Sequence, residues 1–200
     1  MQSALKEFND SITRVRHLHG LHVAFEATLT AAIDLSDILR AELVMAVSAL
    51  DKYVHDLTRL GMLECHAGAR PKTDAFNRFH VPLAATAAIA ALSSAGNALN
   101  TEIRSKHSHL SFQHPDKIAD AIRLFSSVSL WEAVGTALGM SAKDAKATLG
   151  LIVDRRNKIA HEADIDPSYP GQLWPINPAM VEKMVNLIER ITHAIHATCA

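Results

Sequence analysis

Apolar residues recur with the period of an α-helix in two long segments, and this pattern limits the folds that the chain can adopt. In residues 35–63 they stand three or four positions apart, at Leu39, Leu43, Ala46, Val47, Leu50, Val54 and Leu57. A second stripe near the C-terminus comprises Val181, Met184, Val185, Ile188, Ile191 and Ile195. Such spacing places the residues on one face of a helix, and no segment alternates convincingly with the period of two expected for strands. We therefore expect an all-α protein.

Proline, glycine and capping residues divide the chain into a bundle of about five or six helices. We expect helices over residues 3–30, 34–60, 82–106 and 115–138, one that begins at Ser141, and a last one that begins at Pro178. Gly61 is expected to end the second helix, and a break near Ser126 to interrupt the fourth. Residues 64–80 and the proline-rich segment 164–177 are expected to be loops. With 200 residues, we expect 1–200 to form a single domain.

The composition of the chain limits where in the cell the protein is expected and what it is expected to bind. The chain has a net charge of −1, so any contact with nucleic acid must be local. The most apolar stretch, residues 81–92, is shorter than the ~20 residues that cross a bilayer, and its alanines favour a tightly packed core helix. The N-terminal residues do not form a signal peptide, and the two cysteines do not make a disulfide framework. These features predict a cytoplasmic protein without membrane contact.

The helix that begins at Ser141 carries the strongest functional candidate. Asp144 stands three residues after Ser141, which resembles a capping box. Along this helix Ala145, Leu149, Ile152, Arg156 and Ile159 share one face. A guanidinium in the middle of an apolar stripe is costly unless it is paired or binds an anion, so Arg156 is predicted to be functional.

His161 follows Arg156 by five residues, which places it about 140° away around an unbroken helix. The two side chains can share a pocket only if the helix ends or distorts near Ala160, or if the site lies at the helix tip. Their chemistry suits RNA cleavage. A histidine exchanges protons near neutral pH, and an arginine holds a phosphate bidentately. Asn157 can orient either group, and no metal or other cofactor is required.

The segment Arg156-Asn157-Lys158-Ile159-Ala160-His161 is similar to the R-x4–6-H motif of HEPN domains, in the form with a polar residue after the arginine. Residues 35–63 also resemble an early helix of the HEPN subfamily associated with ribosomal L-PSP-like proteins. The resemblance implies an α-helical bundle that dimerises, with the two motifs facing each other across the two-fold axis. It also implies that Arg156 and His161 are catalytic and that Asn157 supports them.

The same resemblance implies a metal-independent endoribonuclease that leaves a 2′,3′-cyclic phosphate. Such proteins act as toxins in toxin–antitoxin systems or as phage-defence effectors, so RNA, an antitoxin and a nucleotidyltransferase are the implied partners. Some HEPN proteins are inactive, and the alternative is a module that binds RNA, a nucleotide or a protein. A third alternative is a helical interaction protein in which Arg156 is structural.

Other polar residues are weaker candidates. Asp51 and His55 lie one helical turn apart and either contact and support the motif side chains or form a surface ion pair. Lys158 either touches RNA or lies on a solvated face. The chain has 12 histidines, but no cysteine or carboxylate stands beside them at a metal-ligand spacing, so we expect no metal site.

Overall fold

Nine helices occur in the residues that the computed structural model describes, which are 1–30, 33–91, 95–169 and 171–200. In chain order they are α1 (Gln2–Thr28), α2 (Ser36–His66), α3 (Asp74–Asn77), α4 (Leu83–Ala90), α5 (Ala95–His107), α6 (Pro115–Arg123), α7 (Leu130–Leu138), α8 (Ala142–Glu162) and α9 (Pro178–Cys199). An isolated bridge between Ile165 and Leu173 is the only β-type pairing in these residues. The predicted all-α class is confirmed.

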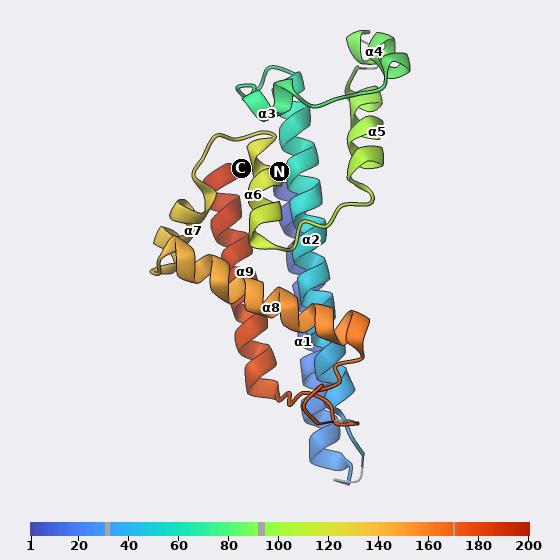
Figure 1. Cartoon of the computed structure of the whole chain (residues 1–200), viewed down its shortest axis with the longest axis vertical. Helices are drawn as coiled ribbons and strands as arrows, with labels where there is room; N and C mark the ends of the chain where they lie inside the picture. Colours follow the sequence, from blue (N-terminus) through green and yellow to red (C-terminus); the bar gives the residue numbers. More distant parts are fainter. Residues whose placement is uncertain (31–32, 92–94, 170) are drawn as a thin grey trace.

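Helix α2 is the centre of the bundle. It packs against α1, α5, α6, α8 and α9, and its contact with α1 is the most extensive of all. Figure 1 shows α1, α2 and α9 running along the long axis of the molecule, with α8 crossing them obliquely. The C-terminal end of α8 therefore lies across α2 rather than along it, and this end carries the candidate motif.

The two predicted apolar stripes form the core. All seven stripe residues of α2 are buried, and so are those of α9 except Met184, which is partly buried and packs against the core. Aromatic side chains tie α1 to α2, because the rings of Phe8 and Tyr53 lie 5.7 Å apart. The Tyr53 hydroxyl lies 3.1 Å from Nδ1 of His196 on α9. One continuous core thus joins the first, second and last long helices.

Helix starts follow the local signals in the sequence. Ser141 caps α8 by accepting a hydrogen bond from the backbone N–H of Asp144 at 3.0 Å. Pro115 and Pro178 occupy the first position of α6 and α9, where a missing N–H has no cost. Gly139 ends α7 in the left-handed conformation with φ of 72°. The starts of these three helices and the end of α7 confirm the predictions.

The predicted end of α2 at Gly61 is wrong, because the helix continues to His66. Gly61 is buried, and a Cβ atom on it would collide with the ring of Phe125. The glycine therefore allows close packing of the α6–α7 connection on α2, and it is not a helix terminator. The predicted loop 64–80 is correspondingly shorter and contains the single turn of α3.

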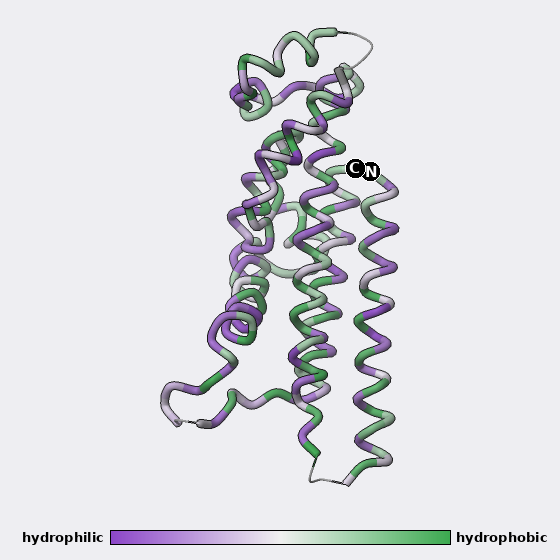
Figure 2. Tube along the Cα trace, turned by 90° about the vertical axis from the view of Figure 1, so that its right-hand side faces the viewer, coloured by the Kyte–Doolittle hydropathy of each residue, from purple (hydrophilic) through white to green (hydrophobic). Residues whose placement is uncertain are grey.

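The predicted core helix at residues 81–92 is also wrong. Helix α4 ends at Ala90, has no buried residue, and leaves Leu83 87% exposed. Residues 92–94, in the predicted helix 82–106, lie outside the described residues, and α5 begins after them. Alanine favours a helix but buries little apolar area per side chain. Figure 2 shows the apolar colouring of α4 at the outer end of the molecule.

Among the described residues, no helix combines the length and the apolar character that a membrane span requires.

Two glycines provide a test of the Gly61 packing. Gly61→Ala is expected to lower the free energy of unfolding by about 1–3 kcal/mol, because the added methyl group overpacks the contact with Phe125. Gly20→Ala is the matched control, since Gly20 lies within α1 with open space around its Cα. It should stabilise the protein by about 0.5–1 kcal/mol. Urea unfolding measures both, and equal effects would contradict this account of Gly61.

Candidate functional site

The apolar stripe of α8 is confirmed up to the candidate motif. Ala145, Leu149 and Ile152 are buried, and Ile159 packs against the core at its edge. Arg156 lies between them and is half-buried. It thus occupies the place where the buried seam of α8 reaches the surface.

The guanidinium of Arg156 has hydrogen-bonding capacity left over. Its Nη1 donates to Oδ1 of Asn157 at 3.0 Å. Its Nε is shielded from solvent and has no hydrogen-bond partner among the described residues. An arginine carries five N–H donors, and a buried donor without a partner is unfavourable. An anion at this edge would accept hydrogen bonds from the Nη groups of the half-buried guanidinium.

His161 is exposed, and α8 does not end or distort before it. The helix continues to Glu162, one residue beyond His161, so the two side chains remain about 140° apart around the axis. The distortion that would bring them into one pocket is absent. Both residues lie near the C-terminal end of α8, where Arg156 is on the buried seam and His161 is on a different face.

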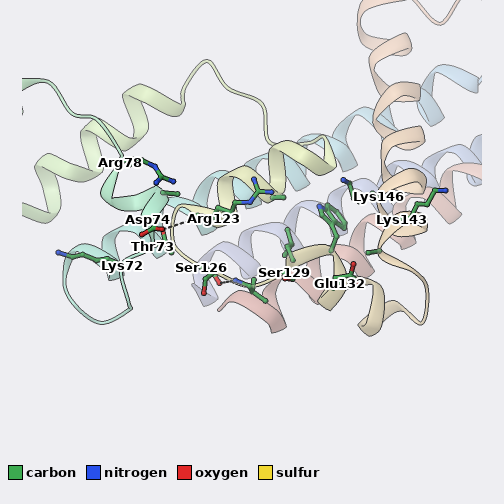
Figure 3. A pocket seen from close by; sticks show the side chains of 17 residues that line it. Lys72, Thr73, Asp74, Arg78, Arg123, Ser126, Ser129, Glu132, Lys143 and Lys146 are labelled. Carbon is green, nitrogen blue, oxygen red and sulfur yellow. Dashed lines mark hydrogen bonds between the residues drawn. The ribbon is translucent and has the colours of Figure 1, made fainter.

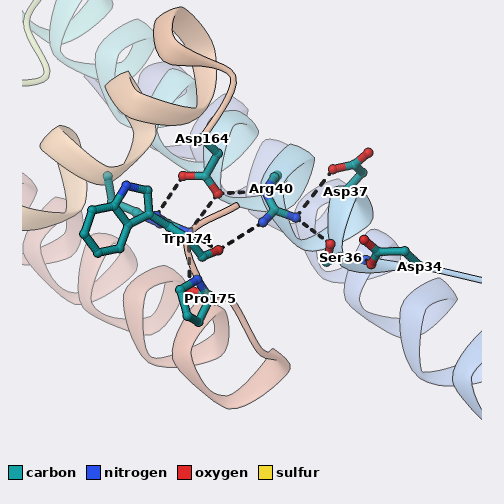
Figure 4. Close-up of polar contacts among 8 residues, drawn as sticks. Asp34, Ser36, Asp37, Arg40, Asp164, Trp174 and Pro175 are labelled. Carbon is teal, nitrogen blue, oxygen red and sulfur yellow. Dashed lines mark hydrogen bonds and ion pairs between the residues drawn. The ribbon is translucent and has the colours of Figure 1, made fainter. Parts of the chain in front are cut away.

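A buried ion cluster fixes this tip. Asp164, which follows the helix, is 1% exposed at its side chain and lies 2.7 Å from Arg40 of α2 and 2.7 Å from Arg155 of α8. Both arginines also donate to the carbonyl of Trp174 at 3.1 Å. Figure 4 shows Arg40, Asp164 and Trp174 converging between the start of α2 and the loop after α8. The cluster joins three segments that are remote in sequence.

The backbone turns sharply to bring Asp164 into this cluster. Ala163 and Asp164 have φ of 52° and 57°, in the left-handed region that residues other than glycine seldom adopt. The N–H of Asp164 donates to the carbonyl of Lys158 at 3.0 Å and closes the end of the helix. The ion cluster offsets the cost of this turn and thereby sets where α8, and the motif on it, ends.

Arg155 and Arg156 therefore have different surroundings. Burial lowers the pKa of the Arg155 guanidinium, while the adjacent Asp164 opposes the shift. Arg155 is held by a carboxylate and two backbone carbonyls. Sequence reasoning missed Arg40, Asp164 and this use of Arg155, because Arg40 and Asp164 are 124 positions apart. The sequence signal that could have indicated the cluster is Asp164 itself, an acidic residue just after the helix that carries the motif.

Asn157 and Lys158 line one pocket beside the ion cluster. The pocket has a volume of about 630 Å³ and is also lined by Trp174 and Glu162. Nζ of Lys158 lies 4.6 Å from the centre of the Trp174 ring, a cation–π contact. These two candidates within the motif thus share a surface with the Trp174 ring.

Asp51 and His55 of α2 contact the end of α5 and the connector that follows it. Asp51 accepts a hydrogen bond from the backbone N–H of Phe112, and Nε2 of His55 lies 3.7 Å from Asp51. The His55 ring lies 4.4 Å from that of Phe112 and 6.4 Å from that of His107. Burial lowers the pKa of His107 to about 4, so it is neutral at pH 7. These contacts make Asp51 and His55 part of the packing against α5 and the connector that follows it.

Within the part of the chain that the structure describes, no group of three or more His, Cys, Asp or Glu residues has the geometry to hold a metal ion. The candidate residues near the tip of α8 supply a guanidinium, an imidazole, an amide and an ammonium group.

A comparison with protein families places this geometry in context. The model of the family described as RiboL-PSP-HEPN matches residues 9–199. The match covers α2 and the complete motif on α8. No curated protein and no solved structure gave a significant match.

Removal of the central carboxylate should destabilise the protein strongly. Asp164→Ala leaves two buried arginines without their shared anion, and the free energy of unfolding should fall by about 3–5 kcal/mol. Asp37→Ala is the matched control, because Asp37 contacts the same Arg40 at 3.5 Å but is 86% exposed. Its effect should be at most about 1 kcal/mol. Thermal and urea unfolding compare the two, and a small effect of Asp164→Ala would refute the role given to the cluster.

Proposed function

The chain belongs to the RiboL-PSP-HEPN family, and we propose that it is a metal-independent endoribonuclease that acts as a homodimer. HEPN domains are in general ribonuclease-like or nucleotide-binding modules. The observation that carries the specific proposal is Arg156, a half-buried arginine in the first position of the R-x4–6-H motif, whose Nε has no hydrogen-bond partner among the described residues. We propose Arg156 and His161 as the catalytic residues and Asn157 as their support.

The reaction that suits these groups is an internal transesterification of RNA. The 2′-hydroxyl attacks the neighbouring phosphorus, the new 2′-O–P bond forms, and the bond from phosphorus to the 5′-oxygen breaks. The products are a 2′,3′-cyclic phosphate and a free 5′-hydroxyl. His161 exchanges the proton with the attacking or the leaving oxygen. Arg156 binds the phosphate and stabilises the charge that develops on it.

Two chains make a better site than one. Arg156 and His161 lie on different faces of an unbroken α8, so one chain presents them in different directions. A two-fold axis near the tip of α8 would bring the arginine of one protomer towards the histidine of its partner. Several large apolar side chains around this tip are exposed and available for such a contact: Leu151, Ile165, Tyr169, Leu173 and Met180.

Membership of the family supports a proposal for the biological role. We propose that residues 1–200 form one domain that acts in the cytoplasm on RNA as a toxin or a phage-defence effector. Such an enzyme has to be restrained, and an antitoxin or a nucleotidyltransferase is the class of partner that would do so. Lys158 is the additional residue that we place against the RNA, because it lies beside Asn157 in the same pocket.

The ribonuclease proposal is tested with purified protein and RNA in the presence of EDTA. The wild type should cleave and leave 2′,3′-cyclic ends, and Arg156→Ala and His161→Ala should each lower the rate by roughly 100-fold or more. Arg14→Ala and His17→Ala, both exposed on α1, are the matched controls and should cleave like the wild type. Cleavage that survives in both motif variants would remove the active-site assignment.

The same assay distinguishes the alternative function. Asn157 already occupies one donor of Arg156, and the exposed His161 imidazole makes no hydrogen bond to any side chain or backbone group of the described residues. A catalytically inactive module would look similar. Wild-type protein that binds RNA or a nucleotide without cleaving it would support the module and reject the enzyme.

Mixing two inactive variants tests whether the site is shared between protomers. Arg156→Ala and His161→Ala, unfolded and refolded together in equal amounts, form mixed dimers in which one composite site keeps both side chains. Half of the dimers are mixed and one of their two sites is intact, so about a quarter of wild-type activity should return. Each variant refolded alone is the control. No recovery, with mixed dimers shown by mass spectrometry, would mean that each site uses residues of a single chain.

A further inference from the structure

A second polar groove lies at the opposite end of α8 from the motif. It has a volume of about 990 Å³ and is bordered by α3, the end of α6, the start of α7 and the first turns of α8. The Thr73 hydroxyl donates to the carbonyl of Arg123 at 2.8 Å and joins α3 to α6. The buried Trp131 indole donates to the carbonyl of Pro115 at 2.9 Å. The walls of the groove are therefore held together by contacts within the fold.

Basic side chains dominate this groove although the chain as a whole carries a net charge of −1. Its acidic lining residues are Asp74 and Glu132. Its basic lining residues are Lys72, Arg78, Arg123, Lys143 and Lys146. Figure 3 shows Lys72 and Arg78 towards one end, Lys143 and Lys146 towards the other, and Arg123 between them. The positive charge thus extends along the groove.

Three of these cations have no acidic partner among the residues that the structure describes. Lys146 pairs with Asp116 at 2.7 Å, and Arg123 pairs with Asp120. Lys72, Arg78 and Lys143 are exposed and make no ion pair with any described residue. Exposed cations left unpaired on separate elements are available to an external anion. Ser127 and Ser129, also in the lining, add hydroxyl donors.

The layout favours an extended polyanion over a small ligand. A small anion would need several donors converging on one point, whereas here long flexible cations are spread along an open groove. Point contacts to successive phosphates are the usual sequence-independent part of nucleic-acid binding. We propose that this groove binds the phosphate backbone of an RNA strand outside the cleavage site. The choice of RNA rests on the function proposed above.

Helix α8 sets the distance between this groove and the motif. Lys143 lies in its first turn, and Arg156 follows 13 residues later, which corresponds to about 20 Å along the axis. A stacked single strand has one phosphate per about 3.4 Å, so roughly six phosphates bridge the two places. A trinucleotide at the motif cannot reach the groove, whereas an RNA of 20 nucleotides can.

The experiment measures the binding of 2′-O-methyl RNA, which keeps the backbone but lacks the 2′-hydroxyl needed for cleavage. The groove variants are Arg78→Glu and Lys143→Glu. Their matched controls are Arg14→Glu and Lys6→Glu on α1, outside the groove. A glutamate at Lys143 also suits the N-terminal turn of α8, so this variant should fold. Fluorescence anisotropy gives Kd at several salt concentrations.

Each groove variant is expected to bind the 20-nucleotide RNA roughly tenfold more weakly than its control, with a salt slope lower by about 0.7 for each lost phosphate contact. Binding of a trinucleotide should not change, because the Debye length is about 8 Å at physiological salt, well below the roughly 20 Å that separate the places. Groove variants that bind the long RNA like their controls overturn the inference. Equal weakening in all four variants also overturns it, since binding would then be spread over the whole surface.

The groove and the ribonuclease activity can fail separately. If the wild type cleaves RNA but the groove variants bind like their controls, the groove inference is rejected and the enzyme stands. If the wild type does not cleave RNA but the groove variants lose the long RNA, the groove is supported and the enzyme is rejected.

Discussion

The burial of Asp164 between two arginines determines where the motif lies. A carboxylate out of contact with water is unfavourable unless charged groups and hydrogen bonds surround it. Here Arg40 comes from the central helix and Arg155 from the motif helix, and both arginines also donate to the carbonyl of Trp174 in the loop before α9. The cluster therefore connects the start of α2, the end of α8 and the approach to α9. The end of the motif helix is fixed by this long-range contact more than by any local stop signal.

Because of this anchoring, the adjacent residues Arg155 and Arg156 have different surroundings. Successive residues on a helix point about 100° apart, so Arg155 can be held in the ion cluster while Arg156 stays on the seam, where its Nε has no hydrogen-bond partner among the described residues. The anchor also keeps α8 intact through His161. Because α8 is unbroken, it presents Arg156 and His161 on different faces, and our proposal of a site shared by two copies rests on this geometry.

Local patterns predicted the helices well where packing followed periodicity. The stripes of α2 and α9, the cap at Ser141 and the place of Arg156 on the seam were all readable from spacing. Gly61 was misread because its role depends on Phe125, which is distant in sequence. Residues 81–92 were misread because high apolar content does not specify a partner surface, and α4 contacts chiefly α5. Asp164 escaped prediction for the same reason, since its main partner lies on another helix.

Charge distribution explains how a nearly neutral chain can be suited to RNA. Uniformly spread charges of both signs attract a polyanion weakly, because screening removes interactions beyond about 8 Å at physiological salt. Unpaired cations gathered at one place act within that distance. In this fold they gather beside the first turns of α8, where Lys143 lies, while the other end of the same helix carries Arg156. Helix α8 is unbroken, so it keeps Arg156 and His161 on different faces. For the same reason it holds the groove and the motif at a fixed spacing.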